Sequence, residues 1–165
     1  SEEEYLAIIA DKTASLFNVS YEAGPLLSGR SEHDRQRFAE FGEKIGIAFQ
    51  IADDLLDFVG DAELTGKEPG NDVLNGKVTL PLIYSLKQVG EASSREMIER
   101  LRQKRDHDTF KRVFDFISEN GGLDYAYRRA DELCQQGLDS IKPIESSLYY
   151  TSLVEMVRFT SARVA

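Results

Sequence analysis

Residues 49–57 read Phe-Gln-Ile-Ala-Asp-Asp-Leu-Leu-Asp and place three aspartates within five positions of an otherwise apolar helical segment. On a helix, Asp53 and Asp57 lie four residues apart and point the same way, with Gln50 about one turn earlier on that stripe. Gly46 comes about a turn before Gln50 and leaves the stripe bare of side chain. Stacked carboxylates repel each other, so we expect a cation to hold them there, and hard oxygen ligands suit Mg²⁺.

The segment that follows supports a phosphate ligand. Residues 61–77 are rich in glycine and contain Lys67, Asp72 and Lys77. A new helix is expected to open just after this loop, with Pro81 in its first turn, where proline is tolerated. Carboxylates that collect Mg²⁺, with lysines on a loop beside them, are what a diphosphate group needs.

Clustered aspartates on a helix are most often a solvated face, but the neighbours of these three are apolar nearly all round. This pattern predicts a largely buried helix in which Asp53 and Asp57 need partners. Asp54 lies about 100° off their stripe. Two roles stay open for Asp54: it binds metal through water, or it pairs with a basic residue.

Four motifs stand in a fixed order here: Gly46-x-x-Phe49-Gln50-x-x-Asp53-Asp54-x-x-Asp57, Gly66-Lys67, Gly70-x-Asp72 and Gly76-Lys77-x-Thr79-Leu80-Pro81. Together they resemble the second aspartate-rich region of the trans-type polyprenyl diphosphate synthases. Residues 4–17, which include Lys12-Thr13, are similar to the lysine–threonine helix of that family. Residues 121–126 and the last helix resemble its C-terminal helices, so the resemblance covers essentially the whole chain.

The resemblance implies an all-α helical bundle of the isoprenoid synthase type and a prenyltransferase. Such an enzyme condenses isopentenyl diphosphate with an allylic diphosphate, after Mg²⁺ has helped the allylic C–O bond to ionise, and gives a longer polyprenyl diphosphate. The metal set it implies is Asp53 as a direct ligand, with Asp54, Asp57 and Asp72 as further metal or water ligands. The diphosphate clamp and catalytic set it implies is Lys12 with Thr13 beside it, Lys67, Lys77, Asp53, and Gln50, whose carbonyl dipole can stabilise a carbocation.

One departure from the family pattern bears on activity. Family members carry two aspartate-rich motifs that face each other across a cavity, and this chain holds one Asp-Asp-x-x-Asp. The upstream basic residues that bind isopentenyl diphosphate in the family have no counterpart here. We therefore expect a fragment that corresponds to the C-terminal half of a synthase and is inactive alone. Apolar faces at residues 6–16 and 47–55 are then expected to be exposed and to favour a homodimer or a higher oligomer.

Composition limits the class of protein further. The chain has 165 residues, which suggests a single domain over 1–165, and carries a net charge of −9 from 29 acidic and 20 basic residues. That balance argues against nucleic acid as a partner, because a phosphate backbone needs a basic footprint. Cys134 is the single cysteine, so no internal disulfide can form, which is consistent with a cytoplasmic protein. No apolar run approaches about 18 residues, so no transmembrane segment is expected.

Helical periodicity extends over most of the chain, and strand alternation is absent. We predict helices over residues 2–17, 31–59, 80–88, 93–102, 108–120, 123–141 and 147–161, with a short stretch at 21–27. Ser31 is a candidate N-cap. Ile47, Ala48, Ile51, Ala52 and Leu55 form the predicted core stripe of the long helix.

Three rival functions are carried alongside the synthase. A naturally short, non-catalytic subunit that regulates a complete synthase is one, although the intact Asp-Asp-x-x-Asp argues against it. A terpene cyclase of related fold is the second, and the Gly-Lys signatures favour the synthase over it. An acidic helical metal-binding domain without chemistry is the third, and product analysis with labelled isopentenyl diphosphate would separate it from the others. Product chain length cannot be read from this chain, and the wording of residues 71–81 leans weakly toward long-chain members.

Overall fold

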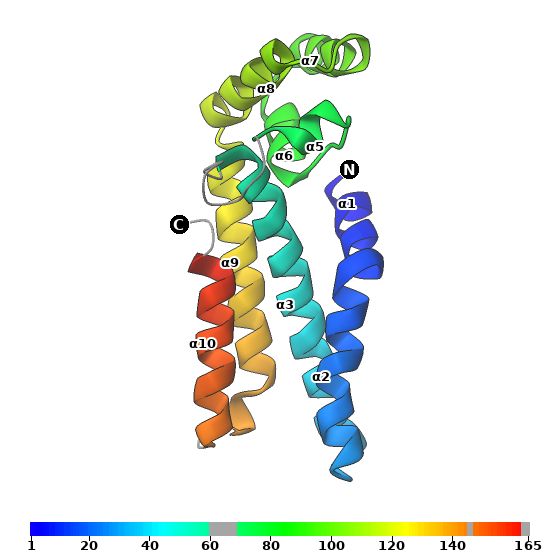
Figure 1. The fold of residues 1–165 in the computed structure, drawn as a ribbon, viewed down its shortest axis with the longest axis vertical. Coiled ribbons are helices and arrows are strands. Elements are labelled where there is room, and N and C mark those ends of the chain that lie inside the picture. The colour runs from blue at the N-terminus through cyan, green and yellow to red at the C-terminus, as the bar shows by residue number, and fades with distance from the viewer. Residues whose placement is uncertain (60–68, 145–146, 163–165) are drawn as a thin grey trace. The chain divides into compact units, whose positions relative to one another are not determined.

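The computed structural model describes residues 1–59, 69–144 and 147–162, and every regular element in these ranges is helical (Figure 1). The all-α prediction is confirmed. In chain order the elements are α1 (Glu2–Ile9), a π-helical turn (Ala10–Ala14), α2 (Ser15–Leu27), α3 (Glu32–Val59), α5 (Asn71–Leu74), α6 (Leu80–Gln88), α7 (Glu91–Gln103), α8 (His107–Glu119), α9 (Gly122–Ser140), a 3₁₀ turn (Lys142–Ile144) and α10 (Leu148–Ala162).

The helices predicted after residue 31 are present with small changes at their ends, because periodicity and capping are local signals. The helix predicted to end near residue 17 instead continues through α2 to Leu27 and includes the short stretch 21–27. At the start of α3, the hydroxyl of Ser31 accepts a hydrogen bond from the Asp34 N–H at 3.1 Å, as expected of an N-cap. Three elements were not predicted, one of which is the 3₁₀ turn Lys142–Ile144. The π-helical turn Ala10–Ala14 interrupts the expected helix over residues 2–17, and α5 forms inside the segment expected to be a loop.

The chain divides into two compact units, which we describe separately. Unit 1 comprises Ser1–Tyr5 and Asp53–Tyr127, and unit 2 comprises Leu6–Ala52 and Arg128–Arg163. The boundaries fall inside α1, α3 and α9 rather than in connecting loops. The prediction of a single domain over residues 1–165 therefore stays a prediction.

Unit 1 is built around a small apolar core. Helices α6, α7 and α8 contact one another, and α5 also contacts α8. The core residues come from the end of α3 and from these four helices: Phe58, Val73, Leu82, Leu101, Val113 and Ile117. This core fixes α5 and the segment after it beside the last two turns of α3.

Unit 2 rests on close contact between α3 and the segment that runs through the π-helical turn into α2. Gly46 of α3 lies so near this turn that a Cβ placed on it would be 2.6 Å from the Cα of Ala14. On another side of α3, Gly137 of α9 faces Phe41 and Ile45, both fully buried. Small residues therefore set the separations of these helices.

The predicted core stripe of α3 is confirmed, since all five of its residues are buried. The expectation that residues 47–55 present an exposed apolar face is wrong for the same reason: Ile51 and Leu55 are 0% exposed, because other parts of the chain already cover them. The exposed apolar face expected on the first helix is present, with Ile8 and Leu16 more than half exposed.

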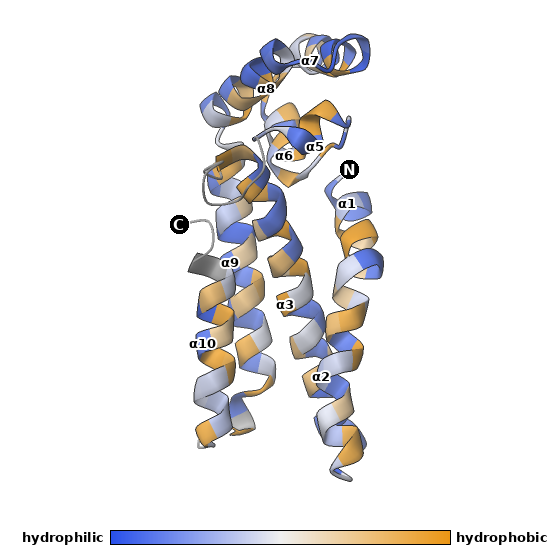
Figure 2. Cartoon of the chain, viewed as in Figure 1, coloured by the Kyte–Doolittle hydropathy of each residue, from blue (hydrophilic) through white to orange (hydrophobic). Residues whose placement is uncertain are grey.

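Figure 2 shows hydrophobic and hydrophilic residues mixed along each helix rather than a wholly hydrophobic helix. In the part of the chain that the structure describes, no helix has both the length and the apolar character needed to cross a membrane, as the sequence predicts.

Candidate functional site

Helix α3 runs without interruption for 28 residues and carries the three aspartates in its last two turns. Asp53 is exposed, Asp54 is buried and Asp57 is half-buried. The prediction that the apolar surroundings bury Asp53 is therefore wrong. Residues two apart on a helix are separated by roughly 200°, so Asp53 points away from the buried side on which Ile51 and Leu55 lie.

Asp54 has a partner that neither open alternative included. The hydroxyl of Tyr5 donates a hydrogen bond to Oδ2 of Asp54 at 2.7 Å. Both side chains belong to unit 1, and both residues are buried, at 7% and 6% exposure. Burial, together with the negative charge of Asp54, raises the pKa of the Tyr5 hydroxyl well above its ordinary value, so it stays a donor. No signal in the sequence pointed to this pair, because 49 residues separate its members.

Asp57 holds the start of α5. Its Oδ2 accepts the backbone N–H of Asp72 at 2.9 Å, and its own carbonyl accepts the N–H of Gly70 at 2.7 Å. Gly70 has a φ of +90°, a conformation that glycine adopts without strain. Burial raises the pKa of Asp57, while the N–H groups of α5 and the charge of Lys77 act in the opposite direction. The third aspartate of the motif thus ties the loop to α3.

Asp72 and Lys77 close this loop. The Lys77 ammonium donates to Oδ1 of Asp72, and the Lys77 N–H donates to the Asp72 carbonyl at 2.9 Å. The hydrogen bond to Asp72, and to a smaller extent the charges of Asp72, Asp54 and Asp57, raise the pKa of Lys77. Its side chain is still about half exposed, at 54%. In the described part of unit 1, Lys77 therefore lies within the field of three carboxylates.

The remaining predicted residues of the described chain lie in unit 2. Lys12 is exposed on the π-helical turn, and Thr13, next to it, donates a hydrogen bond from Oγ1 to Oε1 of Gln50 at 2.7 Å. A π-helical turn shifts the phase of side chains within a helix and is common at functional sites. The structure therefore pairs Thr13 with Gln50. A cavity shared by Lys12 and Asp53 joins two different units and stays a prediction.

The predicted set of metal ligands is not assembled as a cluster. In residues 1–59, 69–144 and 147–162, no three His, Cys, Asp or Glu side chains are grouped as they would be around a metal ion. The reason is local: Asp54, Asp57 and Asp72 each already engage a protein group. Lys67, a predicted diphosphate ligand, lies outside the described residues, as does Gly66.

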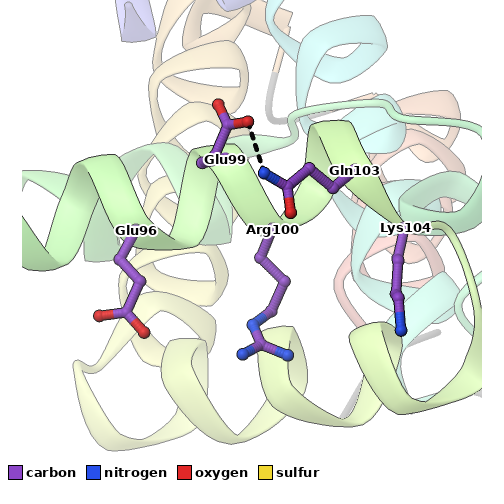
Figure 3. Close-up of a pocket in the computed structure, with 5 residues that line it drawn as sticks. All are labelled: Glu96, Glu99, Arg100, Gln103 and Lys104. Atoms are coloured by element: carbon purple, nitrogen blue, oxygen red, sulfur yellow. Dashed lines mark hydrogen bonds between the residues drawn. The ribbon is translucent and has the colours of Figure 1, made fainter.

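A hollow on the surface of unit 1 does not belong to this site. Five polar or charged residues line it: Glu96, Glu99, Arg100 and Gln103 of α7, and Lys104 directly after that helix. Figure 3 shows Glu96, Arg100 and Lys104 pointing to one side of the helix, while Gln103 bonds to Glu99 on another. None of the predicted site residues is among them, and spacings of four residues on one helix are typical of a solvated face.

Comparison with known proteins places this arrangement in a family. The family model for polyprenyl synthetase matches residues 1–117. The chain is 34% identical over 164 residues to an all-trans-nonaprenyl-diphosphate synthase (geranyl-diphosphate specific) from Rhodobacter capsulatus, covering 99% of this chain and 50% of that protein. It is 33% identical over 157 residues to an octaprenyl diphosphate synthase from Haemophilus influenzae, covering 94% and 47%.

A solved structure agrees with these relatives. The polyprenyl synthase from Caulobacter crescentus, complexed with calcium and isoprenyl diphosphate, is similar with a TM-score of 0.91 and 32% identity, over 100% of this chain and 51% of that one. The chain thus spans about half the length of the relatives it matches. Its helices, its aspartate motif and these comparisons agree, and the chain belongs to the polyprenyl synthetase family.

Proposed function

We propose that this chain forms part of a prenyltransferase that condenses isopentenyl diphosphate with an allylic diphosphate to give a longer polyprenyl diphosphate. The observation that carries the proposal is the end of α3 in unit 1. There Asp53 is exposed and Asp57 is half-buried one turn later, and Asp57 binds the loop that carries Lys77. Membership of the polyprenyl synthetase family supports the reaction class.

The residues present fit a divalent cation held by few protein ligands. Asp54, Asp57 and Asp72 each bond to a protein group, whereas no hydrogen bond or ion pair of Asp53 is seen among the described residues. Mg²⁺ is commonly bound by one or two carboxylates, with water and substrate phosphates completing its octahedron. We therefore propose Mg²⁺ as the cofactor, with Asp53 and Asp57 as direct ligands and with Asp54 and Asp72 acting through water or through neighbouring groups. When bound, the ion neutralises the diphosphate and so makes it a better leaving group.

We assign the lysines to binding of the substrate rather than of the metal. Lys77 is paired with Asp72 but half exposed, so a diphosphate can compete for its ammonium group. Lys12 is exposed on the π-helical turn, in the unit that also holds Gln50. We assign Lys77 to binding of the diphosphate, while the same role for Lys12 and Lys67 stays a prediction from the family resemblance.

We assign Thr13 and Gln50 to stabilisation of the developing carbocation. The hydroxyl of Thr13 holds the Gln50 carbonyl oxygen at 2.7 Å and so fixes the direction of the amide dipole. A fixed dipole stabilises a developing positive charge without having to reorganise during the reaction. The pair therefore orients the carbonyl in advance, and no side chain in this set needs to act as a nucleophile.

We also propose that the protein acts in the cytoplasm as a homodimer. The apolar side chains of α2 support self-association, since Leu16, Val19 and Leu27 are 70%, 62% and 86% exposed. These residues recur at spacings of three and eight, which places them on one side of the helix. Large exposed apolar side chains that recur on one side of a helix favour cover by another protein segment.

The test uses the natural full-length protein with Mg²⁺, an allylic diphosphate and labelled isopentenyl diphosphate. Asp53→Ala is expected to lower turnover by about a thousandfold, since it removes the exposed carboxylate that would bind the cation. Asp115→Ala, which removes an exposed carboxylate on α8 of the same unit, is the matched control and should leave turnover unchanged. Near-normal product formation by Asp53→Ala would refute the proposed function.

A further inference from the structure

We propose that Tyr5 is a positioning residue for the metal site: its buried hydroxyl fixes the orientation of the Asp54 carboxylate and thereby strengthens binding of the divalent cation. This inference rests on the proposed function. Its geometric basis is the 2.7 Å hydrogen bond from the Tyr5 hydroxyl to Oδ2 of Asp54. The bond joins α1 to α3 inside unit 1.

Both partners of this hydrogen bond are buried. Tyr5 is 7% exposed, so phenylalanine could fill the same space. A buried hydroxyl without a hydrogen-bond partner is destabilising, so the tyrosine hydroxyl needs the acceptor that Asp54 provides. At 6% exposure, the Asp54 carboxylate cannot rely on water for its hydrogen bonds. A hydrogen bond from a hydroxyl to a carboxylate is charge-assisted and among the stronger kinds, so it offsets part of the cost of burying both groups.

The bond also separates the roles of adjacent aspartates. Asp53 is exposed, while Asp54, one residue later, is turned inward and held by Tyr5. A carboxylate held by a fixed donor keeps one rotamer, and its charge then acts from one place. Tyr5 therefore determines where one of the charges around the loop is located.

Loss of the Tyr5 hydroxyl should have a measurable effect on the affinity for the cation. Removing a hydrogen-bonding group that orients a residue of a metal site typically weakens metal affinity by about 10–100-fold. Tyr5→Phe keeps the ring and removes the hydroxyl alone. We expect this variant to bind a divalent cation about tenfold more weakly, and to need about tenfold more Mg²⁺ for half-maximal turnover. Turnover at saturating Mg²⁺ should stay within about threefold of wild type, because Tyr5 touches neither substrate in this assignment.

Unit 1 supplies a matched control. The hydroxyl of Tyr125 donates to both carboxylate oxygens of Glu2, at 2.8 and 3.0 Å, and neither residue is in the aspartate motif. Tyr125→Phe thus removes the same kind of bond at another place in the same unit. It should change thermal stability without changing cation affinity.

The experiment measures binding of Mn²⁺, a hard cation with similar ligand preferences, by the loss of the free-ion electron paramagnetic resonance signal. It uses the full-length protein as wild type, Tyr5→Phe, Asp54→Asn, the double variant, Tyr125→Phe and Asp53→Asn. If Tyr5 acts through Asp54, Tyr5→Phe should weaken Mn²⁺ binding about tenfold in the wild-type background and less than twofold in the Asp54→Asn background.

Three results would overturn the inference while leaving the proposed function intact. They are unchanged Mn²⁺ affinity in Tyr5→Phe, an equal loss in the Asp54→Asn background, and an equal loss in Tyr125→Phe. Each requires that Asp53→Asn still weakens binding. If Asp53→Asn binds Mn²⁺ as tightly as wild type, the metal site of the proposed function and this inference both fail.

Discussion

Gly46→Ala tests how α3 and the π-helical turn are held together in unit 2. A Cβ on Gly46 would lie 2.6 Å from the Cα of Ala14 and 2.8 Å from its Cβ. Ordinary carbon–carbon contacts are about 3.5–4.0 Å, so the two segments would have to separate by about 1 Å. Ala14 is 0% exposed and the nearest atom belongs to its backbone, so no flexible side chain can give way.

The size of the effect follows from two opposing terms. Overpacking of a buried contact costs about 1–3 kcal/mol, and a clash with backbone belongs at the upper end of that range. Alanine is favoured over glycine inside a helix by about 1 kcal/mol. We therefore expect Gly46→Ala to lower the free energy of unfolding by about 2 kcal/mol. A separation of about 1 Å would also stretch the Thr13–Gln50 bond from 2.7 Å beyond hydrogen-bonding distance.

Urea unfolding of the full-length protein measures the first effect, with the midpoint and the slope fitted separately. Gly137→Ala is the control, because it makes the same substitution inside α9 of the same unit. Its Cβ would lie 3.1 Å from Cδ1 of Ile45, the free end of a side chain that can move. This control should cost less stability than Gly46→Ala, because its nearest contact is longer and is made by a side chain rather than by backbone. A Gly46→Ala variant that is as stable as Gly137→Ala and keeps full turnover would refute the packing argument.

Two further predictions concern carboxylates of unit 1. Burial raises the pKa of Asp57 above its ordinary value of 3.8, so the ionised carboxylate lowers the stability of the folded protein at pH 7. Asp57→Asn should therefore raise the melting temperature of the metal-free protein at pH 7 and lose that gain below pH 3.8. The same variant should abolish stabilisation by Mg²⁺. A lower melting temperature at pH 7 without metal would contradict this. Asp106 caps α8 through the Thr109 N–H at 2.9 Å, and that bond lowers its pKa. The stabilisation that Asp106 contributes is present above pH 3.8 and is lost as the pH falls through the lowered pKa. Asp106→Ala should therefore lower the melting temperature at pH 7 but not at pH 2. A decrease in melting temperature that is independent of pH would be evidence against the cap.

The helices could be predicted because their signals are local. Apolar residues repeat with the helical period along α3, and Ser31 lies where an N-cap belongs, so both the core stripe and the start of the helix follow from neighbours in the chain. The π-helical turn Ala10–Ala14 had no such signal. It forms where the helix meets Gly46, at a contact 32 positions away along the chain.

The amino-acid sequence by itself determined the family and the all-α class, and it indicated the candidate site residues, because the aspartate motif and the Gly-Lys motifs are contiguous. Only the tertiary structure decided which aspartate is exposed and which partner each of the others meets. Asp53 is exposed, Asp54 is bound by Tyr5 and Asp57 is bound by the start of α5. These partners lie 49 and 15 positions away along the chain. Helical spacing gives the direction of a side chain around its own axis, and the partner it meets depends on which helix packs on that side.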